Sequence, residues 1–266
     1  MPTSMVWIYA LPTWLFFLIV LAVFVGLSTG GLLAYRRLVP PRDEVSHNDV
    51  AGPIVGTIGT ILAVILSFLL IGNWQEYDSA GSVMATEASS IADVYHAAEY
   101  FPAATRDALR SQCRVYVDEL IADEWPAMRQ GGRSNAAGQA SLAILKTIAQ
   151  YQPQTQAQQS LQQSVLGYVN QFQDNRRARL FANEQGIPIV FWAGNLFLAA
   201  VTIGFCYLFR VRNEKMHLLM TAALAAVIAT LMVIIAEFDY PFRGDGQIPP
   251  WPFVNLQHRM ADPSLD

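Results

Sequence analysis

The stretch VAGPIVGTIGTILAVILSFLLIGNWQ, residues 50–75, contains no charged side chain. Three further runs share this property: residues 1–35, 185–209 and 216–236, the last interrupted only by His217. Each run meets the roughly 20 apolar residues that a helix needs to cross a bilayer. The sequence therefore predicts an integral membrane protein with four transmembrane helices, at about residues 7–35, 50–75, 187–209 and 216–237.

The composition also indicates a membrane protein. Of the 266 residues, 53% are hydrophobic and 14% are charged, whereas soluble domains carry about 25% charged residues. The first apolar run is not typical of a cleaved signal peptide, because Arg36 and Arg37 follow it instead of preceding it. The net charge is −4 and no basic patch stands out, so we expect no nucleic-acid partner.

Residues 76–185, between the second and third spans, have the apolar periodicity of helices. The second span can continue as one helix up to Pro102, because no proline interrupts it beyond Asn73-Trp74. Further helices are expected at about residues 103–125, ended or kinked by Pro126, at about 141–151, and from about 161 to 185. Four helices with one apolar stripe each pack most economically as a bundle. The fold class is therefore all-α, with an extramembrane four-helix bundle inserted between helices two and three.

The remaining segment, residues 239–266, contains five prolines and is expected to wrap around the rest of the chain or to hang loose. The two cysteines are far apart in this layout: Cys113 lies in the polar middle region and Cys206 in the third span. We expect no disulfide between them.

The second span has one face of small and polar side chains, three or four residues apart. These are Gly52, Gly56, Thr60, Ala63 and Ser67. A second face carries Ile54, Ile58, Ile61, Ile65 and Leu69. Two faces with side chains of such different size are expected to have different neighbours. The face of small side chains suits either close contact with another helix or a lumen.

Polar groups at membrane depth are costly unless they have partners or water. Serine and threonine can bond back to their own helix, whereas the amide of Asn195 in the third span needs an interhelical partner or water. Other polar groups collect at the two ends of the second span: Asp49 at one end, and Asn73, Glu76, Glu237 and Asp239 at the other. They are either caps and interfacial groups or the mouths of a conduit, which would enrich cations.

Known catalytic and cofactor motifs are absent from the sequence. It contains no HExxH, CxxC, GxxxxGK[ST], GxGxxG or GxSxG, so we expect neither an enzyme nor a cofactor. Asp93, His96 and Glu99 recur every third residue and resemble half a metal site. His96, however, points away from the apolar edge of its helix. We therefore expect a solvated helix face here and no metal.

Basic residues near the spans suggest the orientation. The two short loops contain Arg36, Arg37, Arg42, Arg210, Arg212 and Lys215. The opposite side has Arg176, Arg177, Arg179 and Arg243 nearby. The positive-inside rule then places the short loops in the cytoplasm, with the helical bundle and both termini outside a bacterial-type plasma (inner) membrane.

Four fragments resemble a family described as a bestrophin-like domain. They are HNDVAG at residues 47–52, EWP at 124–126, LLMTA at 218–222 and YPFRG at 240–244. The order of the spans and the polar insert match as well, so the resemblance covers nearly the whole chain. It is weaker evidence for true bestrophins.

Bestrophins proper are ring-shaped pentameric anion channels with a helical cytoplasmic region. The resemblance therefore implies an oligomeric pore lined by the second span. Two features depart from that pattern. The narrow face of the second span is built of Gly, Thr, Ala and Ser instead of an aromatic and aliphatic neck, and the charge count places the bundle outside. Anion selectivity does not carry over.

Two functional hypotheses follow. In the first, the protein is a homo-oligomer, a tetramer or pentamer, embedded in membrane lipids. It conducts inorganic ions with a cation preference through a pore lined by Gly52, Gly56, Thr60, Ala63 and Ser67. In the second, it is a non-conducting sensor or scaffold whose helical bundle binds a ligand or partner protein, and the same face only packs helices.

Overall fold

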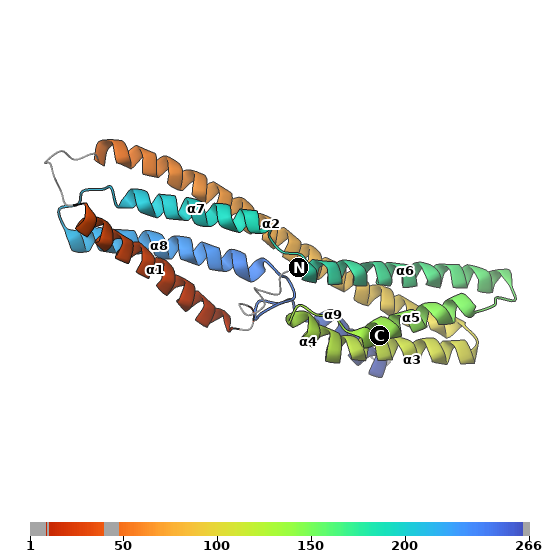
Figure 1. Cartoon of the computed structure of the whole chain (residues 1–266). Helices are drawn as coiled ribbons and strands as arrows, with labels where there is room; N and C mark the ends of the chain where they lie inside the picture. The colour runs from red at the N-terminus through yellow and green to blue at the C-terminus, as the bar shows by residue number, and fades with distance from the viewer. Residues whose placement is uncertain (1–8, 10, 40–47, 263–266) are drawn as a thin grey trace. The chain divides into compact units, whose positions relative to one another are not determined.

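Helices dominate the part of the chain that the structure, a computed structural model, describes: residue 9, residues 11–39 and residues 48–262 (Figure 1). No strand occurs in these ranges. The chain divides into two compact units. We call residues 11–75 and 186–239 the membrane unit, and Tyr9 with residues 76–185 and 240–262 the insert unit. Helix α2 contributes to both.

Four helices are long and apolar enough to cross a membrane. They are α1 (Thr13–Leu38), α2 (Asn48–Ala97), the helical run that ends in α7 (Ile189–Cys206), and α8 (Glu214–Phe238). The prediction of an all-α membrane protein with four transmembrane helices is confirmed.

Helix α8 packs against both α1 and α7 in the membrane unit. The buried core there comes from three helices: Leu62, Leu66, Ala199, Ile203, Ala225, Ile228, Met232 and Ile235. The contact between α1 and α7 depends on Gly31. A methyl group built at this position would lie 2.5 Å from the Tyr207 hydroxyl, so a side chain at residue 31 would displace Tyr207.

Polar contacts join the helices at both ends of the membrane unit. At one end, the Thr13 hydroxyl donates to the Glu237 carboxylate at 3.0 Å. At the other, Arg36 lies 2.9 Å from Nδ1 of His217, and Nε2 of the same ring lies 2.9 Å from the Cys206 carbonyl oxygen. Since arginine can only donate, Nδ1 must accept. In this arrangement Nε2 donates to the carbonyl oxygen.

The insert unit combines the second part of α2 with six further helical segments. These are α3 (Ala103–Glu119), a π-helical turn (Leu120–Glu124), α4 (Trp125–Arg129), α5 (Asn135–Gln150), α6 (Gln156–Glu184) and α9 (Trp251–Ala261). A short 3₁₀ turn, Ala98–Tyr100, joins α2 to α3. The core residues include Ile91, Val94, Leu109, Cys113, Val117, Ile144, Ile148, Val165, Val169 and Phe172. Cys113 and Cys206 are both free.

Two helix boundaries differ from those expected. Pro126 does not end the helical run: it lies in the first turn of α4, directly after the π-helical turn, where a proline needs no N–H donor. Helix α5 begins at Asn135 and not near residue 141. Ser134 caps it by accepting hydrogen bonds from the N–H groups of Ala136 and Ala137.

The proline-rich segment after residue 239 does not hang loose. Its described part belongs to the insert unit and forms α9, whose Phe253, Leu256 and Met260 are buried in the core. Pro252 lies at the start of this helix, where proline is tolerated. The tail therefore supplies core residues to the bundle.

The triad Asp93, His96 and Glu99 is exposed along α2 and the turn that follows it. Glu99 pairs with Arg110 at 2.9 Å and lies 4.0 Å from Arg106. This is the geometry of a solvated, charged helix face.

Phe253→Ala tests whether α9 is part of the folded core. Phe253 is fully buried, and removing such a ring costs about 3–5 kcal/mol. We expect the purified protein to melt at a clearly lower temperature, as followed by circular dichroism in detergent. Trp251→Ala is the matched control, because Trp251 lies in the same helix and is 65% exposed. Equal melting temperatures for the two variants would contradict the packed position of α9.

Candidate functional site

The small-residue face of α2, defined as Gly52, Gly56, Thr60, Ala63 and Ser67, is largely uncovered. Gly52 is half-buried and the other four residues are exposed. A methyl group added at either glycine would meet no other part of the chain within 4 Å. A different side of the helix, about 100° around it, carries Leu62 and Leu66 and is buried in the core of the membrane unit. The described helices of the chain therefore leave the small-residue face open.

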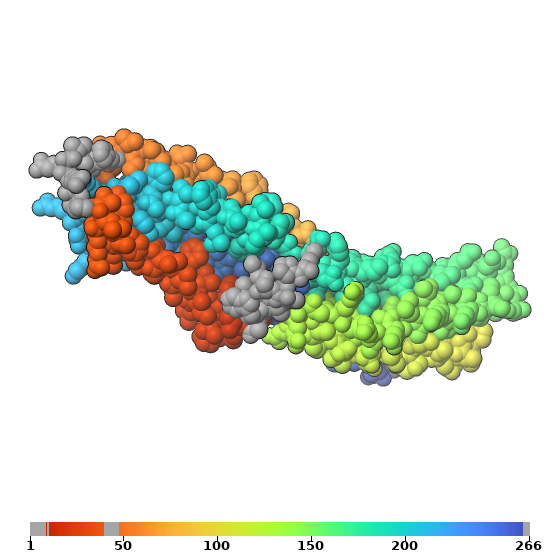
Figure 2. Space-filling view, viewed as in Figure 1, coloured from red at the N-terminus to blue at the C-terminus, as the bar shows by residue number. Residues whose placement is uncertain are grey.

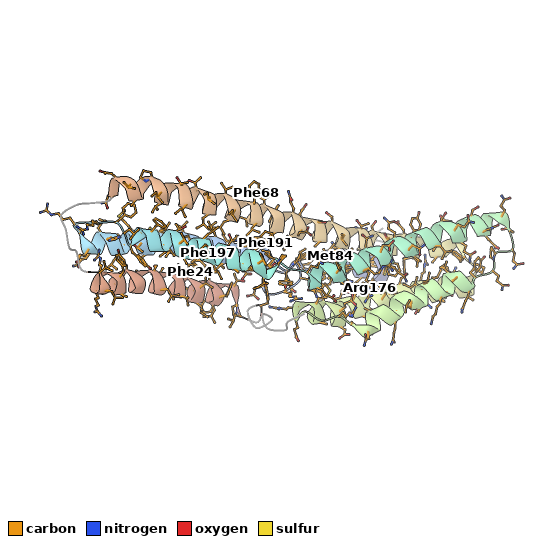
Figure 3. The ribbon with its side chains drawn as sticks, turned by 45° about the horizontal axis from the view of Figure 1, so that its top comes forward. Phe24, Phe68, Met84, Arg176, Phe191 and Phe197 are labelled. Carbon is orange, nitrogen blue, oxygen red and sulfur yellow. The ribbon has the colours of Figure 1, made fainter. Side chains whose placement is uncertain are left out.

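The exposed side of α2 extends beyond this face. Val64, Phe68 and Ile71 are also exposed, and Phe68 points away from α7 (Figure 3). Counted at about 100° per residue, these bulky side chains lie beside the small-residue face, on its side away from the buried leucines. An oligomer would thus have a small face and a bulky face of α2 available to it.

The hydroxyl groups on this side of α2 all bond within the helix. Thr57, Thr60 and Ser67 donate to carbonyl oxygens four residues earlier, at 2.9, 2.8 and 2.7 Å. This is the back-bonding expected for serine and threonine at membrane depth. The hydroxyls need no further donor or acceptor to be stable there.

Asp49, predicted at one pore mouth, is exposed in the first turn of α2. The neighbouring Asn48 exchanges two hydrogen bonds with the backbone of Arg210, one to the carbonyl oxygen at 2.8 Å and one from the N–H at 2.9 Å. This pair fixes the start of α2 to the segment between α7 and α8. Asp49 is therefore attached to an anchored helix end.

Asn73, predicted at the other end of the second span, contacts a neighbouring helix. Its side chain is buried, and the amide donates to the Ile235 carbonyl of α8 at 2.9 Å. The residue belongs to the same buried side of α2 as Leu66. It therefore joins two helices within one chain.

The acidic residues at the end of α8 take part in hydrogen bonds inside the membrane unit. Glu237 accepts from Thr13, and Asp239 accepts from the backbone N–H of Ile187 at 2.5 Å, just before α7 begins. A carboxylate beside a helix N-terminus is favourable, which gives Asp239 a structural role. Glu76 is exposed.

Asn195 is buried in α7, with 3% of its surface exposed. Its amide nitrogen donates to the Phe191 carbonyl of its own helix at 2.8 Å. Its side-chain oxygen has no hydrogen-bond partner among the described residues. The acceptor that the sequence analysis expects to need water or another helix therefore stays unsatisfied within one chain.

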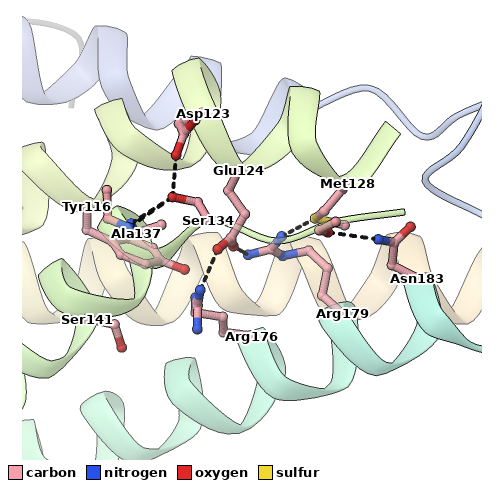
Figure 4. A network of polar contacts seen from close by, with 12 residues as sticks. Tyr116, Asp123, Glu124, Met128, Ser134, Ala137, Ser141, Arg176, Arg179 and Asn183 are labelled. Atoms are coloured by element: carbon pink, nitrogen blue, oxygen red, sulfur yellow. Dashed lines mark hydrogen bonds and ion pairs between the residues drawn. The ribbon is translucent and has the colours of Figure 1, made fainter. Parts of the chain in front are cut away.

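The insert unit contains a buried charge network that the sequence analysis did not single out (Figure 4). At its centre is Arg179 of α6, which has no exposed surface. Its guanidinium binds both carboxylate oxygens of Glu87, at 2.7 and 3.0 Å, and one oxygen of Glu124, at 2.7 Å. Tyr116 donates to Glu87, and Arg176 binds the other oxygen of Glu124.

These partners keep the buried charges in place. Burial alone would lower the pKa of Arg179, but the adjacent Glu87 carboxylate more than offsets this, and the pKa of the guanidinium is raised. Burial raises the pKa of Tyr116 well above its ordinary value, and the charge of Glu87 adds to the effect. Arg179 thus remains charged, and Tyr116 remains a donor, at any pH the protein meets.

Two of the sequence fragments singled out above meet at this network. Trp125 lies under the Arg179 guanidinium, 5.4 Å from it, and its ring touches that of Phe242 edge-on at 5.6 Å. The next residue, Arg243, lies over the Tyr240 ring at 4.0 Å and donates to the Asn183 carbonyl at 2.5 Å. The EWP and YPFRG fragments therefore contact each other, and Trp125 of the first lies against the buried cation.

One signal in the sequence could have revealed this network. Glu87 lies three residues after Met84 and four before Ile91, on the apolar edge of α2, and all three are buried. Likewise, Arg179 lies two turns after Phe172 on the buried face of α6. A charge on an apolar stripe requires an opposite charge on the facing helix.

Comparison with known proteins gives one family and one fold. The model of the bestrophin-like domain matches residues 22–253. A crystal structure of a bacterial bestrophin homologue from Klebsiella pneumoniae, carrying a point mutation, has a TM-score of 0.66 at 12% identity and covers 94% of this chain and 99% of its own. Another structure of that homologue has a TM-score of 0.66 at 11% identity, over 92% and 97%. No curated protein sequence matches.

Arg179→Met tests the charge network. The substitution leaves two buried carboxylates without their shared cation, which costs about 3–5 kcal/mol. We expect a strong fall in melting temperature or in the yield of folded protein in detergent. Arg177→Met serves as control, because Arg177 lies on the same helix with 68% of its side chain exposed. The network would have no stabilising role if both variants melted like the unmodified protein.

Proposed function

Because the chain belongs to the bestrophin-like family, we propose that it forms a homo-oligomeric ion channel whose pore is lined by the small-residue face of α2. The family supports a channel. The open face of α2 supports the choice of this helix, since Gly56, Thr60, Ala63 and Ser67 are exposed while Leu62 and Leu66 hold the helix in its own subunit.

A ring of identical subunits would explain why the small-residue face of α2 is left uncovered within one chain. In a closed cyclic assembly, one surface of each chain faces the symmetry axis and two others face adjacent copies. Small side chains toward the axis leave room for water and ions. The bulky side chains beside them, such as Phe68, are suited to contacts between adjacent subunits or with lipid. The number of subunits consistent with this proposal is four or five.

We further propose that the pore prefers cations. Asp49 and Glu76 are exposed acidic residues of α2, on either side of its apolar segment. Fixed negative charge near a pore mouth raises the local concentration of cations and lowers that of anions. In this proposal the short loops face the cytoplasm of a bacterial-type inner membrane, as their basic residues favour.

Cysteine substitution distinguishes the two faces of α2. Starting from a variant without Cys113 and Cys206, we expect Thr60→Cys and Ser67→Cys channels in liposomes to lose most of their ion flux after a membrane-impermeant, positively charged thiol reagent is added. Ile54→Cys and Ile61→Cys are the matched controls on the same helix and should keep their flux. Each variant is first tested for conduction without reagent.

The possible outcomes test separately whether the protein conducts ions and which face of α2 lines the pore. Block at Val64→Cys and Phe68→Cys, with none at Thr60→Cys and Ser67→Cys, would reject the small-residue face and keep the channel. No flux of potassium, sodium or chloride through the unmodified protein, at any pH from 5 to about 8, would reject conduction. The small-residue face would then be a helix-packing surface in a sensor or scaffold.

Charge neutralisation tests the ion preference. We expect the double variant Asp49→Asn, Glu76→Gln to lose cation preference, because its mouths no longer concentrate cations. The reversal potential in a potassium chloride gradient should move toward the chloride equilibrium potential, most clearly at low ionic strength. Asp174→Asn, an exposed carboxylate of α6, is the control and should leave the potential unchanged. A reversal potential unaffected by the double variant would contradict the proposed role of these residues.

A further inference from the structure

A groove of about 350 Å³ lies in the membrane unit, between α1 and α7. Helix α1 lines it with Val23, Phe24 and Leu27, and α7 with Leu196, Ala200 and Ile203. Figure 2 shows these two helices side by side on the surface, and Figure 3 labels Phe24 on α1. The hydroxyl of Ser28, also in the lining, donates to the Val25 carbonyl at 3.0 Å. The wall is therefore apolar in character and suits hydrocarbon, not a polar ligand.

One end of the groove leads to a cluster of cations. Tyr207 lines the groove toward this end, with its hydroxyl against Gly31 and its ring 6.2 Å from that of Tyr35. Arg36 and Arg37 follow Tyr35 in the last turn of α1. The start of α8 lies at the same end, because Arg36 is 2.9 Å from His217 and 3.7 Å from Glu214.

Several exposed cations lie at this end among the described residues. Arg36 is engaged with His217 and Glu214, whereas Arg37, Arg212 and Lys215 are exposed. Within the described part of the chain, none of these three exposed cations pairs with a carboxylate. Exposed guanidinium and ammonium groups beside an apolar groove match a molecule with a hydrocarbon tail and an anionic head.

We propose that this groove binds an anionic phospholipid, with one acyl chain between α1 and α7 and the phosphate held by Arg37 at the basic end of α1. The dimensions fit. Leu27 and Arg37 are ten residues apart in one helix, which corresponds to about 15 Å. This equals half of the roughly 30 Å hydrocarbon core of a bilayer. A lipid whose head lies beside Arg37 therefore reaches the apolar lining at Leu27 with its chain. The site does not depend on whether the protein conducts ions.

Native mass spectrometry of the purified full chain in detergent tests the proposal, with phosphatidylglycerol and phosphatidylcholine of identical acyl chains as probes. The unmodified protein should bind its first phosphatidylglycerol about tenfold more tightly than phosphatidylcholine. Ala200→Trp fills the groove and should lower phosphatidylglycerol affinity by a similar factor. Ala193→Trp, at an exposed position of α7 outside the groove, is the matched control and should leave both affinities unchanged.

A second pair of variants tests the head-group contact. Arg37→Gln should reduce phosphatidylglycerol affinity to that of phosphatidylcholine, while Arg177→Gln, at an exposed arginine of the insert unit, should not. All variants are compared only after they elute at the size of the unmodified protein. Equal affinity of the unmodified protein for both lipids would overturn the proposal, as would full phosphatidylglycerol affinity in Ala200→Trp. An intermolecular disulfide formed by Ala200→Cys would also overturn it, because the groove would then be occupied by a second copy of this chain.

Discussion

The insert unit depends on the contact between Arg179 and its two carboxylates. A guanidinium with no exposed surface is strongly unfavourable unless its charge and its N–H groups are satisfied. Here Glu87 comes from α2, Glu124 from the π-helical turn, and the cation from α6. The contacts form together only when these three segments lie in the correct register. The network therefore helps to determine how the helices of this unit are aligned along their length.

The surroundings of the cation are aromatic as well as acidic. Trp125 and Phe253 lie 5.4 and 6.0 Å from the guanidinium, and they come from α4 and α9. Cation–π contacts of this kind are stronger when solvent is excluded. The helix after the proline-rich segment thus completes the cover over a buried charge. This explains why a tail with many prolines forms part of a core instead of extending into solvent.

Much of the fold could be predicted from the sequence, and the reasons are physical. The four spans are visible because a bilayer requires long uncharged runs, and α6 is visible because Val165 and Phe172 repeat at helical spacing. Helix α9 was not predicted, because its segment is rich in proline, although Pro252 lies at the start of a helix. The buried network was missed because charged side chains are usually at the surface, although Glu87 and Arg179 lie on the apolar faces of their helices. The contact between Asn73 and α8 could not be predicted, because the sequence does not tell which side of α2 meets α8.

The hydroxyls of α2 have one more consequence. Thr57, Thr60 and Ser67 each direct their only proton to a carbonyl oxygen of the preceding turn. The part of each O–H group that remains accessible is thus the lone pairs, the negative end of its dipole. Such oxygens are suited to coordinate a dehydrated sodium or potassium ion. A chloride ion, which needs hydrogen-bond donors, would receive none from these three side chains. Hydrogen bonding of the hydroxyls to their own helix therefore gives this helix surface a negative electrostatic character without any charged residue.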